Sequence, residues 1–169
     1  MCIRDRKIIN TYGADSVRLF ILSDSPPEKD VQWSEEGIIS CFKFIQKLWS
    51  LHLKISGEIE EKHKKDSGTN LIKFTHQFIK KITDNLNNFS YNVIVANLHE
   101  MYSILSKEMA NEYTRETIVE NYKKILIAVM PIIPHFSNEC LSLLGTRDNI
   151  KWPNYCLLYT SPSPRDPTK

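Results

Sequence analysis

Three lysines are the side chains in this sequence best suited to bind a charged partner. Lys43, Lys47 and Lys54 follow one another at spacings of four and seven residues, which aligns them on one side of a helix. Aligned ammonium groups attract the phosphates of an RNA backbone without reading the base sequence. Lysine is also the commonest residue on a solvated helix face. The spacing therefore leaves two interpretations open, an RNA-binding stripe and an ordinary surface.

No residue pattern in the sequence is typical of a catalytic or metal site. His76, His99 and His135 fall in separate predicted helices, and none is followed by a second histidine four residues later. Serine and cysteine occur without a local His/Asp arrangement, and a Gly-rich phosphate loop is missing. We therefore expect no catalytic residue, no metal ligand and no bound cofactor in this chain. The histidines are interpreted as hydrogen-bonded structural residues.

Nearly the whole sequence is predicted to be helical, because apolar residues recur with the helical period and glycine occurs only 5 times. A first helix is expected to end near Tyr12, with Gly13 in the left-handed position after it. Further helices are predicted at about residues 15–22, 34–55, 70–86, 91–109, 117–130 and 134–144, and an extended segment at Trp152-Pro153. Short connections between most of them predict an all-α, antiparallel helical bundle.

The predicted helix over residues 34–55 must position the lysine stripe. Ser34 is a good N-cap residue for it. Ile38, Phe42, Ile45 and Trp49 recur at the spacing of one helix face. We expect this apolar stripe to face the core, and the three lysines to lie on the opposite side, towards solvent.

Asp15 and Arg18 are the charged residues of the short helix predicted near the N-terminus. Asp15 lies in the first turn, where a carboxylate meets exposed backbone amides and the positive end of the helix dipole. Arg18 follows at a spacing of three residues, which favours a structural pair between the two side chains. Pro26-Pro27 prevents the helix from continuing.

Both ends of the chain have a composition unlike the rest. Residues 1–6 and 156–169 resemble translated adaptor sequence from DNA library preparation, and a genuine Pro/Ser-rich tail is the alternative for the second. Without these ends, 18 basic and 18 acidic residues remain. A global electrostatic attraction to nucleic acid is therefore excluded, and any RNA contact must come from a local basic stripe.

No apolar run approaches the roughly 20 residues of a membrane span. Two distant cysteines, Cys41 and Cys140, suggest buried thiols in a reducing cytoplasm.

A series of short motifs resembles the leucyl-tRNA synthetase family over about residues 7–155. In chain order they are Tyr12-Gly13-Ala14-Asp15 with Arg18-Leu19-Phe20, Pro26-Pro27-Glu28-Lys29-Asp30 with Trp33, Lys43-Phe44 through Lys47 to Trp49, Tyr91-Asn92, Pro131 to Phe136, and Trp152-Pro153. Valyl and isoleucyl enzymes share the first motif but usually have a different loop where this chain has residues 26–30. Asn138 and Leu141 depart from the family pattern, which often has Glu and Trp there.

The resemblance implies a role for each part of the chain. Residues 7–33, with Asp15, Arg18 and Trp33, would form the junction that follows the catalytic domain. Residues 34–155 would form the helical bundle of the anticodon-binding type, with Lys43 and Lys47, and Lys54 beyond them, contacting the backbone of tRNA(Leu). The complete enzyme uses ATP and Mg²⁺ to join leucine to tRNA in the cytoplasm, and its catalytic motifs are not in this sequence. A non-enzymatic helical interaction protein is the alternative from another class.

Overall fold

The computed structural model describes residues 3–24, 32–57, 68–109, 115–146 and 150–156, and within these ranges the chain forms helices and no strands. The helices are α1 (Ile3–Tyr12), α2 (Ala14–Asp24), α3 (Glu35–Ser56), α4 (Thr69–Asn87), α5 (Tyr91–Glu108), α6 (Arg115–Val129) and α7 (Pro134–Leu143). The predicted all-α class and the predicted order of helices are confirmed. Pro26-Pro27 and the tail from residue 157 onwards lie outside the described residues.

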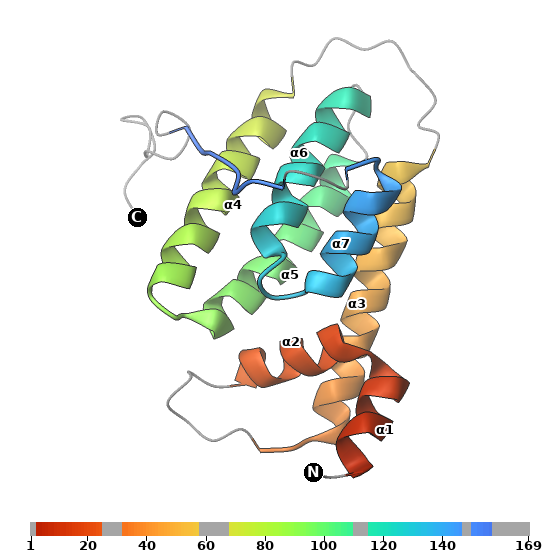
Figure 1. Ribbon diagram of the computed structural model, residues 1–169. Coiled ribbons are helices and arrows are strands. Elements are labelled where there is room, and N and C mark those ends of the chain that lie inside the picture. Colours follow the sequence, from red (N-terminus) through yellow and green to blue (C-terminus); the bar gives the residue numbers. More distant parts are fainter. Residues whose placement is uncertain (1–2, 25–31, 58–67, 110–114, 147–149, 157–169) are drawn as a thin grey trace.

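The helices form a bundle with a smaller helical pair at one end. α3, α4, α5, α6 and α7 run alongside one another, and α4 packs most extensively on α5 and α6 (Figure 1). α1 and α2 form the pair, with α2 crossing the lower end of the bundle, where it packs on both α3 and α5 (Figure 1). Only α3 extends from the helical pair to the far end of the bundle (Figure 1). Its side chains therefore serve both parts.

The core is apolar and draws on every helix from α2 to α7. Its largest fully buried side chains are Leu19, Ile38, Ile55, Leu71, Phe78, Ile79, Ile82, Ile94, Leu98, Ile125, Leu126 and Ile132. Several of them recur at three- and four-residue spacings within a helix, as Phe78 and Ile82 do in α4 and Ile94 and Leu98 in α5. Removing this apolar surface from water is the main force that holds the bundle together.

Two glycines fix how the helical pair meets α3. Gly13 has a φ of 79°, which permits the sharp turn from α1 to α2 and confirms the predicted left-handed position. A Cβ atom added to Gly37, in the first turn of α3, would lie 2.6 Å from the Phe20 ring of α2. Only glycine allows α2 and α3 to approach this closely without a shift of that ring.

The apolar face of α3 differs from the predicted one. Ile38 is fully buried as expected, but Phe42, Ile45 and Trp49 are only half-buried. A second apolar row, Phe44, Leu48, Leu51 and Ile55, faces the core instead. The two rows have the same internal spacing and lie side by side on the helix. The helical period therefore could not decide which of them the bundle covers.

The half-buried part of the predicted apolar row lies at the edge of the core, where the helical pair and α7 also cover it. Tyr12 of α1 meets Phe42 edge-to-face with ring centroids 5.8 Å apart, and Phe136 of α7 meets Trp49 at 6.4 Å. Together with Ile45 these side chains line a groove of about 360 Å³. Partial burial of this row follows from its place at the joint between two groups of helices.

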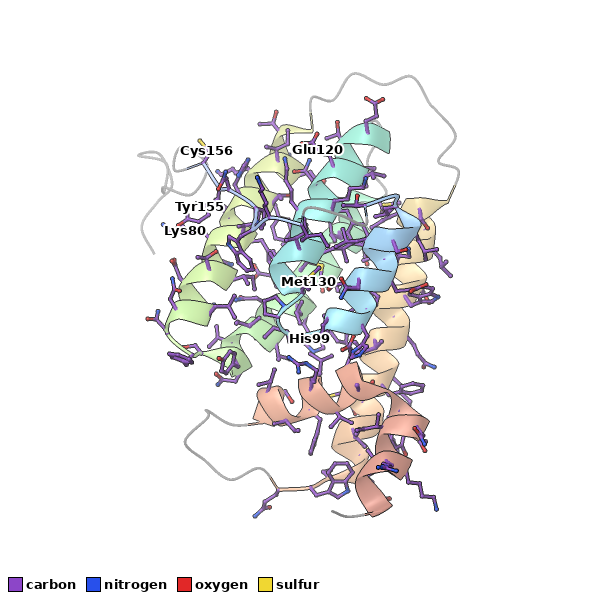
Figure 2. The ribbon with its side chains drawn as sticks, in the orientation of Figure 1. Lys80, His99, Glu120, Met130, Tyr155 and Cys156 are labelled. Carbon is purple, nitrogen blue, oxygen red and sulfur yellow. The ribbon has the colours of Figure 1, made fainter. Side chains whose placement is uncertain are left out.

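The segment after α7 returns across the bundle as extended chain, as predicted for Trp152-Pro153. The indole Nε1 of Trp152 donates to Thr83 Oγ1 at 3.1 Å, and the backbone N–H of Cys156 donates to His76 Nδ1 at 3.2 Å. Figure 2 labels Tyr155 and Cys156 on the side of the molecule where Lys80 of α4 lies. The exit segment is thus fastened along α4.

Candidate nucleic-acid interface

The three lysines predicted to form a stripe are all exposed on one side of α3. No acidic residue follows Glu36 in this helix, so its exposed side carries positive charge alone. Within the described part of the chain, Lys43, Lys47 and Lys54 take part in no ion pair or side-chain hydrogen bond. We call these three residues the basic face. Its ammonium groups are available to an anionic partner.

Two lysines on other helices of the described surface have acidic partners. Lys81 of α4 lies 3.1 Å from a carboxylate oxygen of Glu100 on α5, and Lys124 lies 2.8 Å from Glu120 one turn earlier on α6. The hydrogen bond from Lys124, and then its charge, lower the pKa of the Glu120 carboxyl below its ordinary value. The positive charges of these two lysines are thus neutralised by neighbouring carboxylates, whereas, among the described residues, those of the basic face are not.

A histidine on α5 adjoins the basic face, and the sequence did not reveal it. The imidazole of His99 stacks on the ring of Phe44 with a centroid distance of 3.9 Å and an angle of 28° between the planes. Burial, and then the positive charge of Lys47, lower the pKa of His99 below its ordinary value of 6.5. Lys47 follows Phe44 by one turn of α3, and its charge therefore acts on the imidazole across the seam between α3 and α5.

Asp15 of α2 is nine-tenths buried and caps a different helix from its own. Its carboxylate oxygens accept from the backbone N–H groups of Phe136 at 2.7 Å and His135 at 3.4 Å, in the first turn of α7. Oδ1 also lies 3.0 Å from His135 Nδ1. α7 has no side-chain cap of its own, because its N-cap residue is Ile133. The carboxylate supplies the missing acceptor from 120 residues away.

Arg18 completes this connection from the next turn of α2. Its Nε donates to the carbonyl oxygen of Ile132 at 3.0 Å, and one terminal nitrogen donates to that of Pro131 at 2.8 Å. The predicted pair between Asp15 and Arg18 is therefore wrong, since both side chains reach the segment between α6 and α7 instead. We call Asp15 and Arg18, with residues 131–136, the α2–α7 clamp. It fastens the helical pair to the bundle.

Trp33, the third predicted junction residue, lies just before α3. Its ring meets Phe20 of α2 edge-to-face at 5.3 Å, while 51% of the residue stays exposed. Ile9 of α1 and Ile21 of α2 are also exposed, by 44% and 49%. The end of the molecule formed by the helical pair therefore presents three large apolar side chains to its surroundings.

One histidine lies in the core without a partner. His52 of α3 is fully buried between the rings of Trp49 and Tyr122, and neither of its ring nitrogens has a hydrogen-bond partner among the described residues. Burial lowers the pKa of this imidazole below 6.5. A neutral ring is thus favoured, and packing alone holds it. No sequence pattern distinguishes this residue from the other histidines.

The described ranges offer neither a metal site nor a membrane-spanning helix. No three His, Cys, Asp or Glu side chains there are grouped to hold a metal ion. None of the helices in those ranges is both long enough and apolar enough to cross a membrane. The free thiols of Cys41 and Cys140 have raised pKa values because of burial, and that of Cys140 reaches about 12. Thiolate chemistry is therefore disfavoured at both positions.

Comparison with known proteins gives consistent matches. Residues 69–166 match the family model described as the anticodon-binding domain of tRNA ligase. A leucine–tRNA ligase of Orientia tsutsugamushi is 39% identical over 152 residues, which is 88% of this chain and 18% of the relative. That of Fusobacterium nucleatum is 33% identical over 165 residues, again 88% of this chain and 19% of the relative. The chain thus spans less than a fifth of these curated relatives.

A solved structure agrees with this match in fold. The crystal structure of an Agrobacterium radiobacter K84 LeuRS, in a ternary complex with tRNA and LeuAMS, superposes with a TM-score of 0.78. The likeness covers 92% of this chain and 22% of that one, at 15% sequence identity. The helical arrangement is therefore shared, as the resemblance predicted. The family match extends over more than half of the sequence, and the chain belongs to the family of anticodon-binding domains of tRNA ligases.

Proposed function

We propose that this chain is the tRNA-holding helical domain of a leucine–tRNA ligase. In this role it binds the backbone of tRNA(Leu) and joins the bundle to the catalytic domain. The complete enzyme would use ATP and Mg²⁺ in the cytoplasm, with the catalytic residues elsewhere in the polypeptide. The relatives described above are leucine–tRNA ligases rather than valyl or isoleucyl enzymes, which supports the choice of amino acid. They also disfavour a non-enzymatic interaction protein.

The observation that carries RNA binding is the unpaired basic face. Lys81 and Lys124 lie beside carboxylates, whereas the basic face groups three aligned lysines on a helix that has no carboxylate after Glu36. In the described part of the chain, Lys43, Lys47 and Lys54 have no acidic partner, and a bound partner would supply the negative charge. Phosphates bound by such lysines release counterions, so the binding should be insensitive to base sequence and sensitive to salt.

The test compares two pairs of substitutions in the full-length ligase that contains this chain. Lys43→Gln/Lys47→Gln should weaken binding of a tRNA(Leu) transcript about tenfold at low salt, and lower the slope of log affinity against log salt by about 1 to 2. The control, Lys81→Gln/Lys124→Gln, removes the same charge from paired positions and should change affinity by less than about twofold. Equal effects of the two pairs would exclude the basic face as the binding surface.

The exposed apolar end supports the second part of the proposal, coupling to the catalytic domain. Ile21 on α2 is matched by Leu143 on α7, since both are about half exposed. In the full-length enzyme, Ile21→Ser should lower the rate of tRNA leucylation, whereas Leu143→Ser should not. Leucine-dependent ATP–pyrophosphate exchange measures the catalytic domain by itself. The 169-residue chain should show no such exchange, and exchange by that chain would contradict the proposal.

A further inference from the structure

The seam between α3 and α5 carries a second potential cation beside the basic face. His99 is exposed on α5, and its ring orientation is set by the stack on Phe44, which is 6% exposed and therefore fixed in the core. Lys47 lies one turn after Phe44 on α3, and its charge acts on the imidazole. An imidazole from α5 is thus stacked on α3 one turn before a lysine whose charge acts on it.

The acidic group nearest to His99 in sequence is already engaged. Glu100 follows directly on α5, but both of its carboxylate oxygens accept from Lys81, at 3.1 and 3.3 Å. Lys47 is the charged group that shifts the titration of His99. The seam therefore has cationic groups on both helices, and the carboxylate that could balance them is bound on the α4 side.

We propose that Lys47 and His99 together hold one phosphate of a bound RNA, so that the RNA backbone crosses the α3–α5 seam instead of following α3 alone. This inference rests on the proposed function and extends it to a second helix. A phosphate at the seam would accept charge-assisted hydrogen bonds from both side chains. Its negative charge would also offset the repulsion between them, which favours the protonated imidazole.

The test is a double-mutant cycle in the full-length ligase with a tRNA(Leu) transcript. The proteins are the unmodified enzyme, Lys47→Gln, His99→Gln and the double variant, each measured at pH 6.0 and pH 8.0. At pH 6.0, His99→Gln should weaken binding about fivefold, and by less than about twofold once Lys47 is already replaced. At pH 8.0, where the imidazole is neutral, the substitution should have little effect. Lys124→Gln is the control and should leave the pH dependence unchanged, because its partner Glu120 lies on α6.

Two outcomes separate this inference from the proposed function. If Lys43→Gln/Lys47→Gln weakens binding but His99→Gln has no effect at pH 6.0, the seam contact is wrong and RNA binding by the basic face stands. If the effects of Lys47→Gln and His99→Gln simply multiply, the two side chains do not share a phosphate. The NMR signal of the His99 ring gives an independent readout: it should move towards the protonated position when RNA is added, and an unchanged signal would overturn the inference.

Discussion

The α2–α7 clamp and the basic face use charge in opposite ways. In the clamp, Asp15 and Arg18 direct their polar atoms at backbone groups of residues 131–136, and Asp15 is nearly buried. In the basic face, Lys43, Lys47 and Lys54 are exposed and no described side chain pairs with them. Charge that is satisfied inside the chain fixes its fold. Charge that is left unsatisfied on the surface is available to a partner.

Removing the carboxylate of the clamp should give the largest change in stability. Asp15→Ala leaves the N–H groups of His135 and Phe136 without their acceptor near the base of α7. Losing a cap costs about 0.5–2 kcal/mol and an unsatisfied buried donor about 1–3 kcal/mol, so we expect the free energy of unfolding to fall by about 2–3 kcal/mol. Urea unfolding followed by circular dichroism measures it.

The control for Asp15 is Asp84, an exposed aspartate on α4. Asp84→Ala should change the free energy of unfolding by less than about 0.5 kcal/mol. If Asp15→Ala costs no more than this control, water replaces the carboxylate and the clamp is not what fastens α2 to α7.

A conservative change at Arg18 should have a smaller effect. Its guanidinium reaches two neighbouring carbonyl oxygens at once, those of Pro131 and Ile132. A lysine side chain has a single charged nitrogen and cannot reproduce this planar fork. Arg18→Lys should therefore cost about 1 kcal/mol in the free energy of unfolding, about the value of one hydrogen bond. Arg18→Lys in the Asp15→Ala background should cost less, because the two contacts share one segment.

The sequence was enough to predict the helices, but not the long-range contacts of Asp15 and Arg18 that form the α2–α7 clamp. The helices follow from apolar spacing within ten to twenty residues, which is local information. The partners of Asp15 lie about 120 residues away, so a reading that considers only near neighbours paired it with Arg18. The prediction of the core-facing side of α3 failed for another reason. Two equivalent rows exist on that helix, and only the packing of α1, α2 and α7 decides between them.

The lysines could be found from their spacing, whereas His99 could not. The role inferred for His99 depends on its stack on Phe44 and on the charge of Lys47. Both residues lie more than fifty positions earlier, and only the packing of α3 on α5 brings them into play. The same holds for His52, whose burial sets it apart from the other histidines. Long-range packing thus supplied what residue type and period could not.

His52 extends the comparison to the interior, where this polar side chain has no hydrogen-bond partner within the described part of the chain. His52→Leu removes two nitrogens that lack hydrogen bonds, and at pH 7 it should raise the free energy of unfolding or leave it unchanged, within about 1 kcal/mol. The folded-state pKa lies below the ordinary 6.5. As pH falls below 6.5, the unfolded chain binds the proton first, and the unsubstituted protein loses stability.

The pH dependence of this difference is the decisive measurement. Urea unfolding of both proteins between pH 7.5 and pH 5 should show the His52→Leu variant gaining relative stability as the pH falls below about 6.5. His76 and His99 also have lowered pKa values, but they are present in both proteins and cancel in the difference. Parallel curves would show that His52 is protonated equally well in the folded and unfolded states.

The smallest expected effects concern the free energy of unfolding. They have opposite signs for a lysine paired with a carboxylate and for a lysine beside another lysine. Lys124 lies four residues after Glu120 and pairs with it at 2.8 Å, so Lys124→Gln should lower the free energy of unfolding by about 0.3 kcal/mol. Lys47 lies four residues after Lys43, which carries a like charge. Lys47→Gln should therefore raise the free energy of unfolding by about the same amount.

Salt and pH should act on these two changes differently. Added salt screens both interactions and should shrink both effects. The pKa of Glu120 is lowered in the folded chain, so the stability that its carboxylate contributes is present at neutral pH and is lost as the pH falls below the ordinary carboxyl range. The effect of Lys124→Gln should therefore vanish in acid, while that of Lys47→Gln persists. If Lys47→Gln is destabilising instead, Lys47 has a stabilising partner in the fold, and the basic face is not reserved for RNA.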